Sequence, residues 1–174
     1  GKLAASAFAR ARSMTEEVGA LAALLDVRQG EKELVAFAAR WGRDANVMDK
    51  WYALQIASAD PAEAAALTTR LAETPGFDWK NPNRFRSLIG AMAANHAGFH
   101  HRSGAGYRLV ADWLLKLDPL NPQTAARVST AFETWPRYDA ARRKRARAEL
   151  ERMLAAPSLS GDLREMVERM LAAG

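Results

Sequence analysis

The chain has 174 residues, of which 49% are apolar and none is cysteine, and its formal net charge is +5. This length allows one domain with a buried core, and the apolar content excludes a disordered chain. The lack of cysteine excludes disulfides and thiolate metal sites, and no apolar run approaches the roughly 18–20 residues that a membrane-spanning helix needs. Alanine and leucine outnumber valine and isoleucine, which favours helix over sheet because β-branched side chains lose more entropy in a helix.

Helix-start and helix-stop signals follow one another along the first third of the chain. Ser13 and Glu16 have the spacing of a capping box, in which each side chain satisfies the backbone N–H of the other residue. The helix that follows is predicted to end at Gly30. A second helix is predicted over about 31–41, and a third begins near Asn46.

Two apolar stripes on the third helix indicate that it is buried on a broad face. The stripes consist of Val47, Trp51 and Leu54, and of Met48, Tyr52 and Ile56. We expect Trp51 to be a buried anchor of the fold. The chain has five tryptophans, and an indole ring packs in a core more often than it serves as a stacking platform.

Capping residues and prolines mark the later helix starts. Asp60-Pro61, Asn81-Pro82 and Asn121-Pro122 each place a capping residue before a proline at the first helical position. Asp139 and Ser160 are predicted to cap the last two helices. Helix starts recur at roughly 14–23 residues, so that a helix pair has the length of a two-helix solenoid repeat.

These signals predict the fold class. We expect an all-α protein that forms an irregular α-solenoid of antiparallel helix pairs, similar to HEAT or armadillo arrays, with about nine or ten helices. No stretch has the composition of a linker between domains, so residues 1–174 are predicted to form one helical domain.

The sequence contains no recognisable catalytic or metal-binding motif. There is no His-Glu-x-x-His zinc motif and no glycine-rich phosphate loop. The three histidines, His96, His100 and His101, lie in a predicted loop over 95–106 without a neighbouring carboxylate, so surface or loop-packing roles are the default. We expect no catalytic residue, no metal site and no cofactor in this chain.

Five basic residues gather between positions 142 and 147. One interpretation is a solvated helix face that is balanced by Glu149 and Glu151. The other is a surface that binds nucleic acid or an acidic protein. The cluster lacks the interleaved aromatic residues of a single-strand binding groove, so we do not expect nucleic acid to be a partner.

A series of short segments, in order from about residue 12 to the end, carries a family resemblance. The segments are Met14-Thr15 with residues 21–24, Val47-Met48-Asp49-Lys50-Trp51, Asn81-Pro82-Asn83-Arg84, Arg86-Ser87-Leu88-Ile89-Gly90, Gly104 with Gly106-Tyr107, Asn121-Pro122-Gln123 with Arg127, Arg137-Tyr138-Asp139-Ala140 and Leu159-Ser160-Gly161-Asp162-Leu163. Together they resemble the C-terminal region of bacterial-type aminopeptidase N.

The resemblance implies a function for a longer polypeptide. Enzymes of this family are zinc exopeptidases that remove N-terminal residues from peptides, and their zinc ligands and catalytic glutamates lie in a catalytic domain that has no counterpart here. The C-terminal domain is a helical solenoid that closes the active-site chamber and limits entry. The implied partners are the catalytic domain of the same polypeptide and, in the full-length enzyme, peptide substrates. The implied location is cytoplasmic, without membrane attachment.

Arg86 and Arg127 are the candidate substrate-channel residues. Each lies in a segment that resembles the family, four or five residues after an Asn-Pro helix start and near the apolar stripe of its helix. One interpretation is that both snorkel at the edge of the core or pair with a carboxylate. The other is that both line the chamber and attract the carboxylate end of short peptides, because arginine binds a carboxylate through two hydrogen bonds.

Two other classes of function compete with the peptidase domain. A free-standing basic helical-repeat module that binds nucleic acid or an acidic protein would rest on the arginine cluster alone. An independent enzyme would need a site motif, and the sequence has none.

Overall fold

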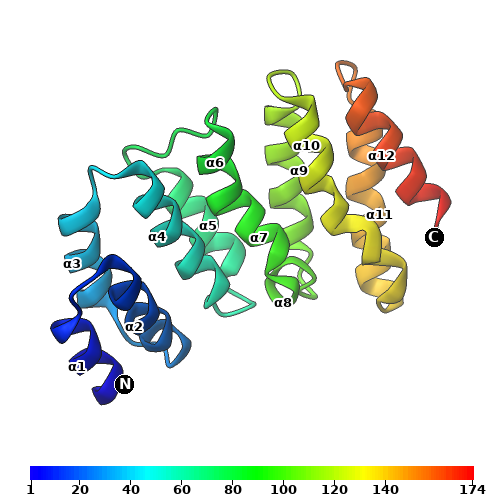
Figure 1. Ribbon diagram of the computed structural model, residues 1–174. Helices are drawn as coiled ribbons and strands as arrows, with labels where there is room; N and C mark the ends of the chain where they lie inside the picture. The colour runs from blue at the N-terminus through cyan, green and yellow to red at the C-terminus, as the bar shows by residue number, and fades with distance from the viewer. The chain divides into compact units, whose positions relative to one another are not determined.

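The computed structural model describes all residues from Gly1 to Gly174, and it contains helices and turns but no β-strand (Figure 1). The predicted all-α class is therefore confirmed. Residues Gly1–Ala59 and Asp60–Gly174 form two compact units, here called unit 1 and unit 2. None of the helices has both the length and the apolarity that crossing a bilayer requires.

Unit 1 consists of four helices around a small apolar core. They are α1 (Lys2–Arg10), α2 (Met14–Asp26), α3 (Glu31–Trp41) and α4 (Ala45–Ala57). The buried core residues are Leu21, Phe37 and Val47. Phe37 is fully buried, and it lies on the same face of α3 as Leu34 and Trp41, which pack against this core.

The predicted capping box at the start of α2 is closed by a different residue. The Ser13 hydroxyl accepts a hydrogen bond from the Glu16 backbone N–H at 3.3 Å, as predicted. The Glu16 carboxylate, however, accepts from the backbone N–H of Arg12 at 2.6 Å rather than from that of Ser13. Both side chains still satisfy backbone donors at the helix entry.

Trp51 is only half-buried, so the prediction that it is a buried anchor is wrong. Its Nε1 donates to the Leu34 carbonyl oxygen at 3.1 Å, which holds the indole at the edge of the contact between α3 and α4. The fully buried side chains of α4 are Tyr52 and Ile56 from the second stripe. Among the five tryptophans only Trp135 is buried.

Unit 2 contains the remaining helices. They are α5 (Ala64–Ala72), α6 (Pro82–Phe85), η1 (Arg86–Gly90), α7 (Ala91–Ala94), α8 (His96–Phe99), α9 (Ala105–Leu117), α10 (Pro122–Ser129), η2 (Thr130–Arg137), α11 (Ala140–Leu154) and α12 (Gly161–Ala172). The segments α6, η1 and α7 form one continuous helix with a π-helical middle, and α10 continues into the 3₁₀ helix η2. Counted as continuous helices, the chain has ten long helices and the short α8, in agreement with the predicted nine or ten.

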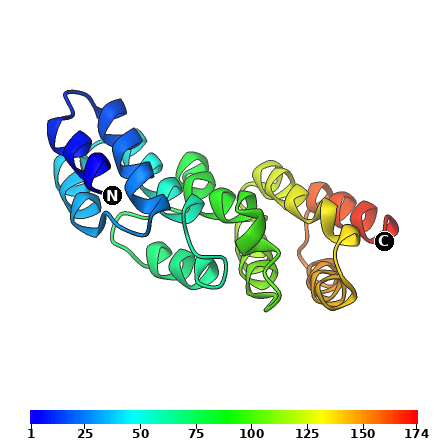
Figure 2. The ribbon, with the colours of Figure 1, turned by 90° about the horizontal axis from the view of Figure 1, so that it is seen from below.

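The last helices of unit 2 are arranged in two layers. Helices α9 and α11 pack side by side in one layer, and α10 and α12 do so in the other (Figure 2). Consecutive helices therefore form antiparallel pairs, α9 with α10 and α11 with α12, and each pair covers the next. This is the predicted repeat arrangement of helix pairs.

Four of the predicted caps are present in unit 2, and two other predictions need correction. Asn81, Asn121, Asp139 and Ser160 each accept a hydrogen bond from a backbone N–H of the helix that follows. The helix predicted at Asp60-Pro61 begins only at Ala64, because Asp60 first caps a turn through the Ala62 N–H. The predicted loop over 95–106 contains α8, so His96 lies on a helix.

Aromatic side chains join α8 to its neighbours. Phe99 makes edge-to-face contacts with Tyr107, at 5.1 Å between ring centroids, and with Phe132, at 4.9 Å. A Cβ atom at Gly106 would lie 2.6 Å from the Phe99 carbonyl oxygen, so glycine is required where α8 and α9 approach each other. This packing fixes the position of His96, which begins α8.

Candidate functional site

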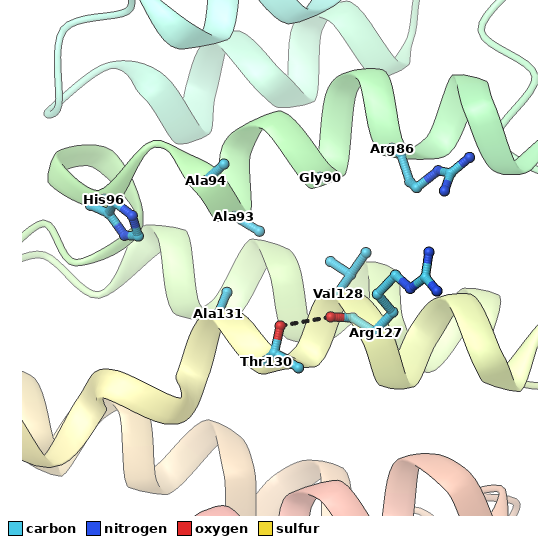
Figure 3. A pocket seen from close by; sticks show the side chains of 9 residues that line it. All are labelled: Arg86, Gly90, Ala93, Ala94, His96, Arg127, Val128, Thr130 and Ala131. Carbon is cyan, nitrogen blue, oxygen red and sulfur yellow. Dashed lines mark hydrogen bonds between the residues drawn. The ribbon is translucent and has the colours of Figure 1, made fainter.

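A groove of about 500 Å³ lies in unit 2 between the continuous helix 82–94 and the helix 122–137 (Figure 3). Its volume lies within the range of small-ligand sites. The side chains of Arg86, Arg127 and His96 give the groove its charge and polarity, and Thr130 adds a hydroxyl. The structure thus brings both predicted channel residues to one site, although 41 positions separate them in the sequence.

Both arginines extend toward the same end of the groove (Figure 3). Both are exposed, and neither forms an ion pair with a carboxylate. The Nη2 of Arg86 donates to the Asn83 side-chain oxygen at 2.6 Å, whereas the Arg127 guanidinium has no hydrogen-bond partner. Donors remain free on both side chains, so an external anion could bind here.

Small apolar residues form the floor of the groove between the arginines and His96. They are Gly90, Ala93, Ala94, Val128 and Ala131. A Cβ atom at Gly90 would lie 3.4 Å from the Cβ of Arg86, which is an ordinary van der Waals contact with the arginine stem. An arginine pair at one end of an apolar floor suits a ligand with an anionic end and an apolar body.

His96 lies at the other end of the groove and was predicted only as a surface or loop histidine (Figure 3). Its ring lies parallel to that of His100, with 6.4 Å between the centroids. No group of three or more His, Asp or Glu side chains that could hold a metal ion occurs in the structure. The groove therefore offers cationic binding groups rather than a set of metal ligands.

His100 is buried behind the groove in a polar network. Its Nδ1 is hydrogen-bonded to the Tyr107 hydroxyl at 2.9 Å and its Nε2 to the Thr134 hydroxyl at 3.1 Å. The ring stacks on Tyr138 with 3.9 Å between centroids. Burial lowers the pKa of His100 to about 4, and the nearby charges of His96 and Arg142 act in the same direction. Burial also raises the pKa of Tyr107 to about 12, so that its phenol stays protonated.

The lowered pKa predicts that the protein becomes less stable as the pH falls from about 6.5 to about 4. In this window the unfolded chain binds a proton at residue 100 and the folded chain does not, so acid favours unfolding. Above pH 6.5 His100 is neutral in both the folded and the unfolded chain, and no stability is lost. The loss of unfolding free energy on acidification amounts to at most about 3 kcal/mol. Urea unfolding at several pH values measures this loss.

A pair of variants assigns the pH dependence. His100→Gln removes the titrating group and should flatten the decline in unfolding free energy between pH 6.5 and 4. His101→Gln, which changes a neighbouring histidine outside the network, should retain the decline. An unchanged slope in His100→Gln would show that other groups cause it.

The basic helix α11 uses most of its arginines in contacts within the chain. The Nε of Arg142 donates to the His100 carbonyl oxygen at 2.7 Å, and the Nη1 of Arg145 donates to the Ser103 carbonyl oxygen at 3.0 Å. Arg147 pairs with Glu151 at 2.8 Å. These contacts favour the interpretation of the cluster as a helix face balanced within the protein.

Comparisons with known proteins show what the chain resembles. Residues 1–172 match a family model described as a domain of unknown function with ARM repeats, DUF3458_C. The aminopeptidase N of Caulobacter vibrioides is 38% identical over 167 residues, which cover 94% of this chain and 19% of that protein. The aminopeptidase N of Haemophilus influenzae is 39% identical over 173 residues, which cover 94% of this chain and 19% of that protein.

A solved structure has the same fold. The crystal structure of Legionella pneumophila aminopeptidase A in complex with aspartic acid matches with a TM-score of 0.92 and 28% identity, and the match covers 99% of this chain and 21% of that one. The chain therefore spans about a fifth of the length of the relatives that it matches. The ARM-repeat description agrees with the helix-pair array predicted from the sequence.

Proposed function

Because the chain belongs to the DUF3458_C family of ARM repeats and is homologous to the C-terminal part of aminopeptidases, we propose that it is the non-catalytic C-terminal domain of a longer zinc aminopeptidase. In that enzyme it covers the active-site chamber and limits which peptides enter. The observation that carries the proposal is the identity of 38–39% to two aminopeptidases N over 94% of the chain. Cytoplasmic location is part of the same proposal.

The zinc ion and the catalytic residues of the enzyme belong to the rest of the polypeptide. The absence of a His-Glu-x-x-His motif from the sequence supports this division. The partner of this chain is then the catalytic domain of its own polypeptide, and peptides are the substrates of the whole enzyme.

The first test uses the chain on its own. We expect the purified 174-residue chain to release no product from amino-acid anilides and to retain no zinc after dialysis. The complete polypeptide, in contrast, should cleave the anilides and retain zinc. Metal analysis and an anilide assay on the two proteins measure the difference. Stoichiometric zinc in the isolated chain, or anilide cleavage by the purified chain, would contradict the proposal that zinc and catalysis belong to the rest of the polypeptide.

The groove has a specific role in the proposed enzyme. Arg86 and Arg127 face the peptide chamber, where they attract the carboxylate end of a short peptide. Their exposure, their position in one groove and the lack of a carboxylate partner support this role. The small residues of the floor leave space for the body of the peptide. Substitution of each arginine by alanine, with free peptides compared with their C-terminal amides, tests this role.

A further inference from the structure

The first two helices enclose an apolar groove that no part of the chain fills. It has a volume of about 630 Å³ and lies between α1 and α2 in unit 1. Its lining residues include Leu3, Ala4, Ala7, Ala11, Gly19 and Ala23. The Leu3 side chain is 88% exposed, and α1 contains no buried residue. A Cβ atom at Gly19 would meet no other atom within 4 Å, which shows how open the groove is.

The last helix of the chain differs from the first in its exposed face. On α12 the exposed side chains include Asp162, Glu165, Glu168 and Arg169, all of which are charged. A charged outer face is typical of the helix that terminates a repeat array in water. The groove between α1 and α2 is lined mainly by alanine and does not have such a charged face. In repeat arrays such a face is covered by a neighbouring helix pair.

We infer that the groove between α1 and α2 binds an amphipathic helix from the part of the longer polypeptide that precedes this chain. The inference rests on the proposed function, under which a C-terminal domain of about a fifth of the length follows the rest of the enzyme. Alanine on both walls and Gly19 on α2 allow a helix to approach closely and to insert large apolar side chains. Arg10 and Glu16 at the rim favour a helix with charged residues beside its apolar face.

The absence of cysteine from the chain allows a direct test with single thiols. Ala7→Cys places a thiol in the groove, and Ala9→Cys places one on the same helix at an exposed position outside the groove. Alkylation rates are measured in the isolated chain and in the complete polypeptide by mass spectrometry of the peptides that contain residue 7 or 9. Circular dichroism checks that the variants remain helical.

The inference predicts protection at one position only. In the isolated chain the two thiols should react at similar rates. In the complete polypeptide the thiol at residue 7 should react at least about tenfold more slowly, while the thiol at residue 9 keeps its rate. Equal rates at both positions in the complete polypeptide would overturn the inference, whether both are fast or both are slow.

Two further outcomes are distinguishable. Protection of residue 7 in the isolated chain, with a dimer in sedimentation equilibrium, would identify a second copy as the occupant and would overturn the inference. Aminopeptidase activity plays no part in the readout. A complete polypeptide that protects residue 7 but cleaves no peptide would therefore refute the proposed function and leave the docking surface intact.

Discussion

Replacing Trp135 with alanine is expected to lower the free energy of unfolding by about 3–5 kcal/mol. Trp135 lies in η2 and is only 3% exposed. Its Nε1 donates to the Met170 carbonyl oxygen at 3.0 Å, so the indole joins η2 to α12. The substitution leaves a cavity in the core and removes the hydrogen-bond donor of a buried carbonyl, and the two losses act together. Urea unfolding followed by circular dichroism measures the change.

Trp51→Ala is the matched control, because the same side chain is removed from a half-buried site. We expect a smaller loss of about 1–2 kcal/mol, since much of the indole is already in contact with water. The two variants also test the prediction that residues 1–174 form one domain. A single transition that shifts in both variants would support one cooperative domain. Separate transitions, each shifted by one variant only, would show that units 1 and 2 unfold independently.

Most helix starts and part of the apolar stripes could be predicted from the sequence because they depend on local chemistry. A capping side chain acts on a backbone N–H two or three residues away, as Asn81 and Asp139 do. On α4, Tyr52 and Ile56 of the predicted second stripe are buried, as the helical period requires.

The errors arise where longer-range contacts decide the structure. Trp51 has the position of a core residue on its own helix, and its partial exposure depends on where the Leu34 carbonyl lies in the preceding helix, α3. The helix α8 forms inside a glycine-containing segment because Phe99 packs against Tyr107 and Phe132 from other helices. Periodicity within one segment does not contain this information.

The candidate site could be predicted only in part. Arg86 and Arg127 are identified from the segments that carry the family resemblance, and each follows an Asn-Pro helix start. That they share one groove depends on the packing of two helices against each other, which the sequence alone does not show. His96 was predicted from the sequence only in a default surface or loop role. Ala131 could not be identified as a groove residue, because a small residue that leaves a groove open looks like any helix-forming alanine.

Arg86→Ala and Arg127→Ala are expected to weaken the use of short peptides by the complete enzyme. The substrates are di- and tripeptides with a free carboxylate, and the expected loss in kcat/KM is about 10- to 150-fold, which corresponds to about 1.5–3 kcal/mol for one charged hydrogen-bonded contact. The reason is that each guanidinium is exposed in the groove without a carboxylate partner and, although Arg86 donates once to Asn83, retains free donors for the end of a peptide. Arg86→Lys or Arg127→Lys should retain part of the wild-type kcat/KM for free peptides, because lysine keeps the charge but not the planar pair of donors.

The C-terminal amides of the same peptides isolate the contribution of the carboxylate. They keep the length and side chains but lack the charge, so both alanine variants should cleave them, and neutral anilides, nearly as well as the wild-type enzyme does. Arg143→Ala removes an exposed arginine from α11, away from the groove, and should change neither class of substrate. If free peptides and amides lose activity equally, the arginines support the structure of the domain and do not bind the substrate. If neither class loses activity, the groove does not face the chamber, since a cation within reach of the peptide end would act more strongly on the charged substrate.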